Sequence, residues 1–231
     1  MTSMFLRTTA TATALFALLA GSASAATLTR PLDPCYVVAT EAQRQSVLVE
    51  AEGFTPFSKV DIFVDEVLQD QPPTLWDGKI SGRVLAPWSE VGQRAFTLRV
   101  SEPAKPENTI EATSLVTRLS VQQSPSRART ADRVRFRGSG FLQAGLPVYA
   151  HYVFAGKARK TVKLNVPQGP CGTFSVKRRQ FPFKNSPRVG VWTIWFDQNP
   201  RYDPKAAGTR VPMTIKVRRT TKQGSASSLP R

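Results

Sequence analysis

Two stretches of this 231-residue chain repeat one pattern: Val47–Phe54 reads VLVEAEGF, and Val134–Phe141 reads VRFRGSGF. In both, every second residue is apolar or small, and the run closes on Gly-Phe. An alternation with a period of two is typical of a β-strand that buries one face. The second stretch therefore predicts that Val134 and Phe136 point into a core, whereas Arg135 and Arg137 point outward.

The similarity continues beyond these two strands, which indicates an internal repeat. After each Gly-Phe comes a short turn with Pro or Gly and then another alternating strand. Further matches follow in the same order in both halves. The matched segments are Lys59–Val64 with Val148–Phe154, Asp77–Gly82 with Cys171–Val176, and Ala95–Val100 with Val191–Phe196.

Each repeat contains about seven short strands separated by Pro, Gly, Asn and Asp turns, and no convincing helical period follows residue 25. This pattern predicts an all-β protein made of two tandem immunoglobulin-like antiparallel β-sandwiches of roughly 100 residues each. We expect the first domain at residues 26–118 and the second at 119–219. The junction around 116–123 is strand-like and has no Gly/Ser linker, so the two domains are expected to abut.

The first 25 residues have the layout of a secretory signal peptide. Arg7 gives a basic start, Ala14–Ala20 is apolar, and Ala23-Ser24-Ala25 is a small-residue cleavage site. The apolar run is shorter than the roughly 20 residues that a membrane span needs. We therefore expect cleavage near Ala25, a secreted or cell-surface protein with no integral membrane segment, and a flexible tail at 220–231.

The strand pattern Val-x-Val-x-x-x-Gly-Phe-x-Pro, found at residues 47–56, resembles bacterial immunoglobulin-like domains of the IPT/TIG and filamin-like kind. Pro34-Cys35-Tyr36 and Gly169-Pro170-Cys171-Gly172 resemble motifs of a group of exported two-domain bacterial proteins. The resemblance covers nearly all of the chain after residue 25. It implies stalks, adhesion or carbohydrate-associated spacers, and it implies no catalytic activity.

The two cysteines, Cys35 and Cys171, fall one in each repeat. Export to an oxidising compartment favours their pairing, and an even count leaves no thiol over. Any bridge within one chain must then join the two domains, and this is the arrangement that we expect. The alternatives are a bridge between two chains or two free thiols.

The motifs of common catalytic sites are absent from the sequence. It contains no Gly-x-Ser-x-Gly elbow, no phosphate-binding Gly-rich loop and no His-Glu-x-x-His. The single histidine, His151, is predicted on the solvent face of a strand, without an evident nucleophile or orienting carboxylate. We therefore expect no enzyme, no catalytic residue, no cofactor and no small-molecule substrate.

Five carboxylates cluster in the first repeat and leave two interpretations open. They are Asp61, Asp65, Glu66, Asp70 and Asp77. They could bind calcium between loops, but they lack the dense Asp/Asn/Gly spacing of a dedicated calcium loop. A solvated acidic edge is the interpretation that we favour, and we expect no metal site.

The net charge of +16 is distributed very unevenly. Residues 26–120 carry 9 Lys and Arg against 13 Asp and Glu (net −4), whereas residues 121–231 carry 22 against 3 (net +19). A row of exposed cations on a strand attracts polyanions in a salt-dependent manner. The candidate polyanion-binding residues are Arg133, Arg135, Arg137, Lys177, Arg178 and Arg179. The alternative is a basic but unpartnered soluble surface.

These observations favour an exported, non-enzymatic protein, monomeric, with a structural or adhesive role at or outside the cell surface. One alternative is a module that binds an anionic polymer, such as an envelope polymer, an acidic polysaccharide or extracellular nucleic acid, through the second domain. Another is an accessory module that binds neutral glycans through Trp76 and Trp88. Polyanion binding should fall steeply with salt, whereas binding to neutral glycans should not.

Overall fold

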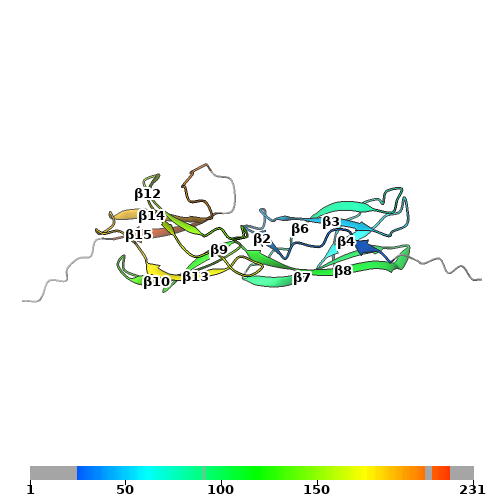
Figure 1. Cartoon of the computed structure of the whole chain (residues 1–231), viewed down its shortest axis with the longest axis horizontal. Helices are drawn as coiled ribbons and strands as arrows, with labels where there is room; N and C mark the ends of the chain where they lie inside the picture. Colours follow the sequence, from blue (N-terminus) through cyan, green and yellow to red (C-terminus); the bar gives the residue numbers. More distant parts are fainter. Residues whose placement is uncertain (1–24, 91, 206–209, 219–231) are drawn as a thin grey trace, which may run out of the picture.

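The computed structural model describes residues 25–90, 92–205 and 210–218, which form fifteen β-strands and no helix. The strands build two β-sandwiches that lie end to end along the long axis of the molecule (Figure 1). This confirms the predicted all-β class and β-sandwich architecture. Among the described residues, no helix is long and apolar enough to span a membrane. The predicted signal peptide, apart from Ala25, and the tail at 220–231 lie outside the described residues.

The first sandwich packs a three-stranded sheet, in the order β1-β3-β6, against a five-stranded sheet, in the order β2-β8-β7-β4-β5. Neighbouring strands are antiparallel except β2 and β8, which run parallel, a pairing that the expected antiparallel pattern did not include. The strands are β1 (Thr27–Leu28), β2 (Cys35–Val38), β3 (Ser46–Glu52), β4 (Asp61–Val64), β5 (Val67–Asp70), β6 (Ile80–Leu85), β7 (Gln93–Glu102) and β8 (Lys105–Arg118).

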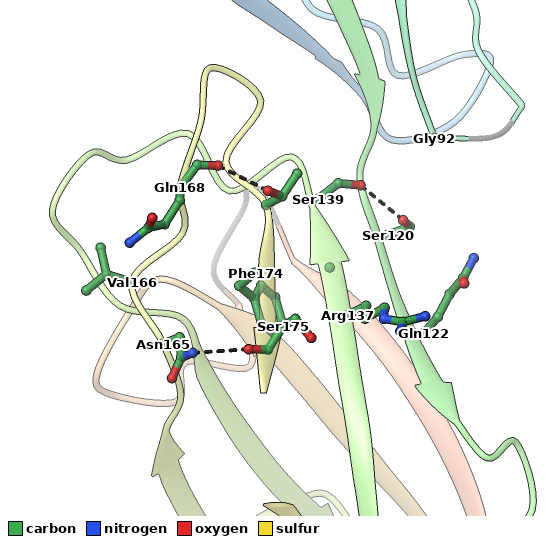
Figure 2. Close-up of a pocket in the computed structure, with 12 residues that line it drawn as sticks. Gly92, Ser120, Gln122, Arg137, Ser139, Asn165, Val166, Gln168, Phe174 and Ser175 are labelled. Atoms are coloured by element: carbon green, nitrogen blue, oxygen red, sulfur yellow. Dashed lines mark hydrogen bonds between the residues drawn. The ribbon is translucent and has the colours of Figure 1, made fainter. Parts of the chain in front are cut away.

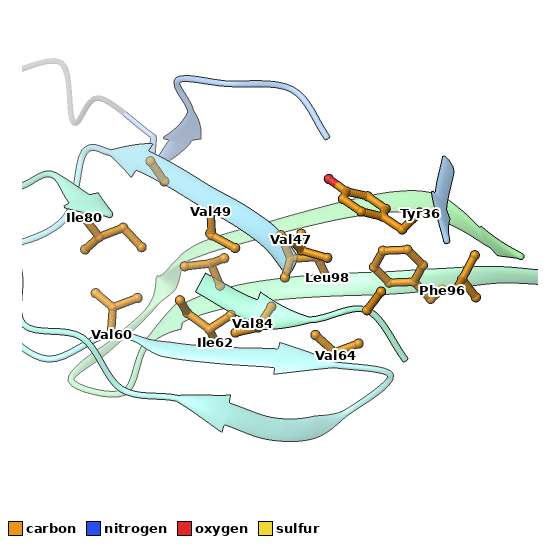
Figure 3. Packing of buried hydrophobic residues seen from close by; sticks show 14 of the residues in the cluster. Tyr36, Val47, Val49, Val60, Ile62, Val64, Ile80, Val84, Phe96 and Leu98 are labelled. Atoms are coloured by element: carbon orange, nitrogen blue, oxygen red, sulfur yellow. The ribbon is translucent and has the colours of Figure 1, made fainter. Parts of the chain in front are cut away.

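The core of the first sandwich follows from the alternation of its strands. Val47 and Val49 of β3 are fully buried, as are Val60, which directly precedes β4, and Ile62 of β4. Figure 3 shows the two sets facing each other between the sheets. Because the residue between Val60 and Ile62 points away from the core, Asp61 lies on the outer side of the sheet.

The second sandwich packs a three-stranded sheet, β13-β10-β9, against a four-stranded sheet, β12-β11-β14-β15. Val134 and Phe136 of β10 are fully buried, which confirms the predicted inward face of this strand. The strands are β9 (Ser120–Ser124), β10 (Arg133–Ser139), β11 (Tyr149–Phe154), β12 (Lys157–Lys163), β13 (Phe174–Arg179), β14 (Gly190–Asp197) and β15 (Val211–Val217).

The repeat found in the sequence reappears as a shared corner in both sandwiches. Gly53 and Gly140 follow β3 and β10 with φ angles of +95° and +88°, a left-handed backbone that favours glycine. The next residue in each repeat donates its backbone N–H to the carbonyl of a second glycine at 3.2 Å. The pairs are Phe54 N to Gly78 O and Phe141 N to Gly172 O.

At the junction between the sandwiches, β2 and the residue that follows it contribute side chains to both cores. Tyr36 and Val38 are buried in the first core, whereas Val37 and Ala39 pack against the core of the second sandwich. Only Leu119 separates β8 from β9, and it is itself buried in the second core. The connection therefore leaves the two sandwiches in direct contact.

A disulfide bond between Cys35 and Cys171 closes this junction, with Cα atoms 5.2 Å apart. Cys35 begins β2 of the first sandwich, and Cys171 lies in the corner of the second, beside Gly172. Both residues are buried. The predicted bridge between the two halves of the chain is thus confirmed, and it ties together positions 136 residues apart.

Candidate functional site

The exposed cations of the second sandwich are arranged by the pairing of β10 with β13. In this antiparallel register, Arg133 lies opposite Arg179 and Arg135 lies opposite Lys177. Because Val134 and Phe136 point into the core, the arginines between and beside them point outward. Five cations therefore share the outer face of one sheet. We call this set the basic face: Arg133, Arg135, Arg137, Lys177 and Arg179.

The side chains of the basic face have no internal partners among the residues that the structure describes. None of the five makes an ion pair or a hydrogen bond with any residue that the structure describes. The third strand of this sheet, β9, places Gln122 opposite Arg137 and Ser124 opposite Arg135, so it supplies no carboxylate. Like charges directly across a strand pair repel each other. The arrangement is thus suited to an anion from outside the chain.

Arg178 does not belong to this face, although the sequence placed it with its neighbours. Its register partner is Val134, a buried residue, so Arg178 projects to the opposite side of the sheet from Lys177 and Arg179. There it lies near Tyr152. Burial raises the pKa of the Tyr152 hydroxyl, and the positive charge of Arg178 offsets part of that rise.

At the end of the basic face nearest the first sandwich lies an open hollow of about 700 Å³. Arg137 and Gln122 line one side, and Asn165 and Gln168 of the β12–β13 connection line another (Figure 2). Gly92 of the first sandwich also contributes to the wall. The sequence did not indicate this hollow, because its walls come from four segments that are separated in the chain.

His151 lies on the outer side of its sheet, as alternation predicted, but the prediction that it faces solvent is wrong. Its side chain is fully buried because the connection between β14 and β15 folds over it. Its Nδ1 lies 2.9 Å from Oγ1 of Thr161, and its Nε2 lies 3.1 Å from Oδ1 of Asp197 and 3.1 Å from the carbonyl oxygen of Asn199. Both ring nitrogens are thus engaged.

Asp197 links this histidine to a cation in the same connection. The second carboxylate oxygen, Oδ2, lies 3.3 Å from Nη2 of Arg210. Burial alone raises the pKa of Asp197, but hydrogen bonds from His151, from the backbone N–H of Asn199 and from Arg210 outweigh it, so the pKa lies below its ordinary value. The cluster anchors the β14–β15 connection onto the sheet, and it leaves the imidazole closed to a substrate.

The two tryptophans considered for glycan stacking do not form one platform. Trp76 precedes β6 and is 75% exposed, whereas Trp88 follows β6 at its other end. Trp88 packs against the first core, and the guanidinium of Arg118 lies 5.5 Å from the centre of its ring. Only Trp76 therefore offers a free aromatic face.

Three of the five clustered carboxylates in the first sandwich form ion pairs with basic residues of the same domain. Asp65 pairs with Arg94 at 2.8 Å, and Glu66 pairs with Arg99 at the same distance. Asp77 pairs with Lys79 at 3.1 Å. Within the described part of the chain, no three His, Cys, Asp or Glu side chains are grouped so that they could hold a metal ion. The cluster has the properties of an ion-paired surface.

No protein-family model matches the chain, and no curated protein matches it. Among solved structures, a β-glucuronidase from Parabacteroides merdae is similar with a TM-score of 0.27 and 10% identity, over 80% of this chain and 23% of the enzyme. The BSP domain of a biofilm-associated protein is similar with a TM-score of 0.25 and 14% identity, over 78% of this chain and 28% of that one. The chain spans less than a third of either structure, and similarity at this level carries no functional inference.

Proposed function

We propose that this chain is an exported, non-enzymatic protein of two immunoglobulin-like domains, 26–118 and 119–219, which acts as a structural or adhesive module outside the cell. We further propose that it holds an anionic polymer on the basic face of its second domain. The observation that carries this proposal is the set of five outward cations on β10 and β13, none of which has a partner within the described part of the chain. A disulfide between buried cysteines supports the assignment to an oxidising compartment.

The shape of the basic face favours an extended ligand over a small anion. Arg133 and Arg137 are four residues apart on one strand, so their Cα atoms are about 13 Å from each other. Lys177 and Arg179 of β13 lie opposite Arg135 and Arg133, so the cations form two neighbouring rows. A polymer with charges at regular intervals can meet several of these side chains at once and release its counterions, which makes binding strong at low salt and weak at high salt.

Binding is a better-supported role than catalysis for the conspicuous polar residues. His151 is fully buried with both ring nitrogens occupied, so it cannot exchange a proton with an external substrate without a rearrangement. Stacking on a neutral glycan is less well supported, because Trp88 is covered and Trp76 stands alone.

The proposal can be tested with the triple variant Arg133→Ser, Arg135→Ser, Arg137→Ser. We expect earlier elution from heparin and DNA columns across a salt gradient, with thermal stability unchanged or slightly higher, because exposed charges usually alter stability by about 0.5 kcal/mol each and the like charges on β10 and β13 repel each other. The matched control is Lys157→Ser, Arg159→Ser, Lys163→Ser, which removes three exposed cations from β12. Equal retention of wild type and the arginine variant, or equal loss in both variants, would reject a specific role for the basic face.

A further inference from the structure

Building on that proposed function, we infer that the hollow at the junction end of the basic face is a subsite for two neighbouring residues of a polyuronic acid. In this subsite Arg137 binds the carboxylate of one sugar and the amide of Gln122 binds its hydroxyl groups, while Gln168, on the far side of Ser175, meets the hydroxyl groups of the next sugar. The inference names the chemical class of polymer, which the basic face alone leaves open.

Arg137 is the residue that belongs to both features. It ends the row of arginines on β10 and also lines the hollow. A planar guanidinium offers paired N–H donors that match the two oxygens of a carboxylate. Since the Arg137 side chain makes no hydrogen bond or ion pair with the described residues, all of its donors are open to a ligand.

The amide side chains of Gln122 and Gln168 add hydrogen-bonding groups to the lining of the hollow. Gln122 lies opposite Arg137 on β9, and neither its side chain nor that of Gln168 makes a hydrogen bond with any described residue. Each primary amide can donate two hydrogen bonds and accept others, which suits the hydroxyl groups of a sugar ring. Figure 2 places Gln168 and Asn165 on the side of Ser175 away from Arg137 and Gln122.

The loop that carries Gln168 is held in place by its own backbone. Gln168 and Thr173 exchange two backbone hydrogen bonds at 2.7 and 2.9 Å, and the Thr173 hydroxyl donates to the Gln168 carbonyl oxygen at 3.1 Å. Asn165 is fixed in turn by a hydrogen bond from Nδ2 to the carbonyl oxygen of Ser175 at 3.1 Å. A preformed wall of this kind lowers the ordering cost of binding.

Nucleic acid fits this surface less well than a polysaccharide. The outward positions of β9, β10 and β13 carry Gln, Ser, Arg and Lys but no aromatic side chain on which a base could stack. Phe174, which touches the hollow, is only 6% exposed and belongs to the core. A DNA duplex would be held mainly through its phosphates by the cations, so the two amides would add little to its binding.

The test compares two variants of the complete chain after signal removal, in its oxidised form. Gln122→Ala with Gln168→Ala removes the amides and keeps the charge, whereas the control Arg133→Gln removes one charge at the far end of the row. Affinities are measured by calorimetry for a hexamer of galacturonic acid, its carboxyl-reduced neutral form and a DNA duplex. Both glutamines are exposed, so thermal melts should be unchanged.

We expect the double variant to bind the uronic acid hexamer about tenfold more weakly, a change of about 1.4 kcal/mol, with DNA affinity unaltered. Arg133→Gln should weaken both ligands, and the neutral hexamer should bind far more weakly than the acidic one. If the double variant loses nothing, or loses DNA and hexamer affinity equally, the subsite is wrong and the basic face survives. If wild type binds no polyanion at low salt, both proposals are wrong.

Discussion

Arg135 of β10 and Lys177 of β13 lie directly opposite each other in neighbouring antiparallel strands, both on the outer face of the second sandwich. Two cations in this position repel each other, whereas an opposite charge would be stabilising. The corresponding strands of the first sandwich contain no such pair, since Leu48 lies opposite Arg83 and Glu50 opposite Ser81. The basic face is therefore a local cost to the fold that the first sandwich avoids.

Lys177→Glu should weaken anion binding and increase the stability of the fold. The new carboxylate would face Arg135 across the strands, so we expect the free energy of unfolding to rise by about 0.2–1 kcal/mol, while retention on heparin falls. Urea unfolding and a salt-gradient column measure the two effects. The control Lys157→Glu makes the same charge change on β12, where the opposite residue is Phe154. An equal gain in stability from both variants would show that net charge, rather than the cross-strand pair, is responsible.

Loss of the disulfide should be the largest single effect on stability. In the chain-entropy model a bridge that closes a loop of 136 residues contributes about 5 kcal/mol, less any strain. We expect Cys35→Ser with Cys171→Ser to lower the unfolding midpoint strongly, and a reductant to lower the wild-type midpoint to the same value. A reductant that also shifts the double variant would point to a cause other than this bridge.

Asp197 should make stability depend on pH in the acid range. Its folded pKa is depressed, so its contribution is present above the pKa of the unfolded carboxyl and is lost as the pH falls through the folded pKa. We expect Asp197→Asn to cost on the order of 2 kcal/mol at pH 7, below the value for a fully enclosed pair because Arg210 reaches solvent. The difference from wild type should shrink between pH 5 and about pH 2. A difference in the free energy of unfolding that stays constant over this range would contradict the prediction. Asp203→Asn, in the same connection, is the control.

Two glycine substitutions can separate the energetic cost of a positive φ angle from the cost of a steric clash. Gly172 and Gly145 both have positive φ angles, +55° and +73°, but a Cβ on Gly172 would collide with the carbonyl oxygen of Phe141, whereas one on Gly145 meets nothing within 4 Å. We expect Gly145→Ala to cost about 1 kcal/mol, and Gly172→Ala to cost clearly more. Chemical denaturation of the two variants gives the comparison, and equal costs would exclude the steric part.

The sequence was sufficient for the inner and outer faces of single strands, because alternation is a local property. It placed Val134 inward and Arg135 outward correctly, and the same alternation, applied within β13, would have separated Arg178 from Lys177. The burial of His151 could not be predicted in this way, since it depends on Asn199 and Tyr202, which follow β14 and return to contact the imidazole.

The hollow could not be predicted from the sequence, for a related reason. Its lining combines β9, β10, the β12–β13 connection and Gly92 of the first sandwich, and these segments meet only through the sheet register and the junction. Gln122 and Gln168 show no distinguishing pattern in the sequence. The parallel pairing of β2 with β8 is likewise a long-range contact without a local signal.

The bridge between Cys35 and Cys171 also determines how the molecule would carry a mechanical load. The covalent path for tension between β1 and β15 runs along the chain to Cys35, crosses the two sulfur atoms and leaves through Cys171, so the stretch between the cysteines cannot be pulled straight while the bond is intact. If the sandwiches unfold under load, an intact bond keeps these 136 residues out of the extended chain, whereas a reduced bond adds about 450–490 Å of contour. The redox state of this one bond thus sets how far the unfolded chain can be extended.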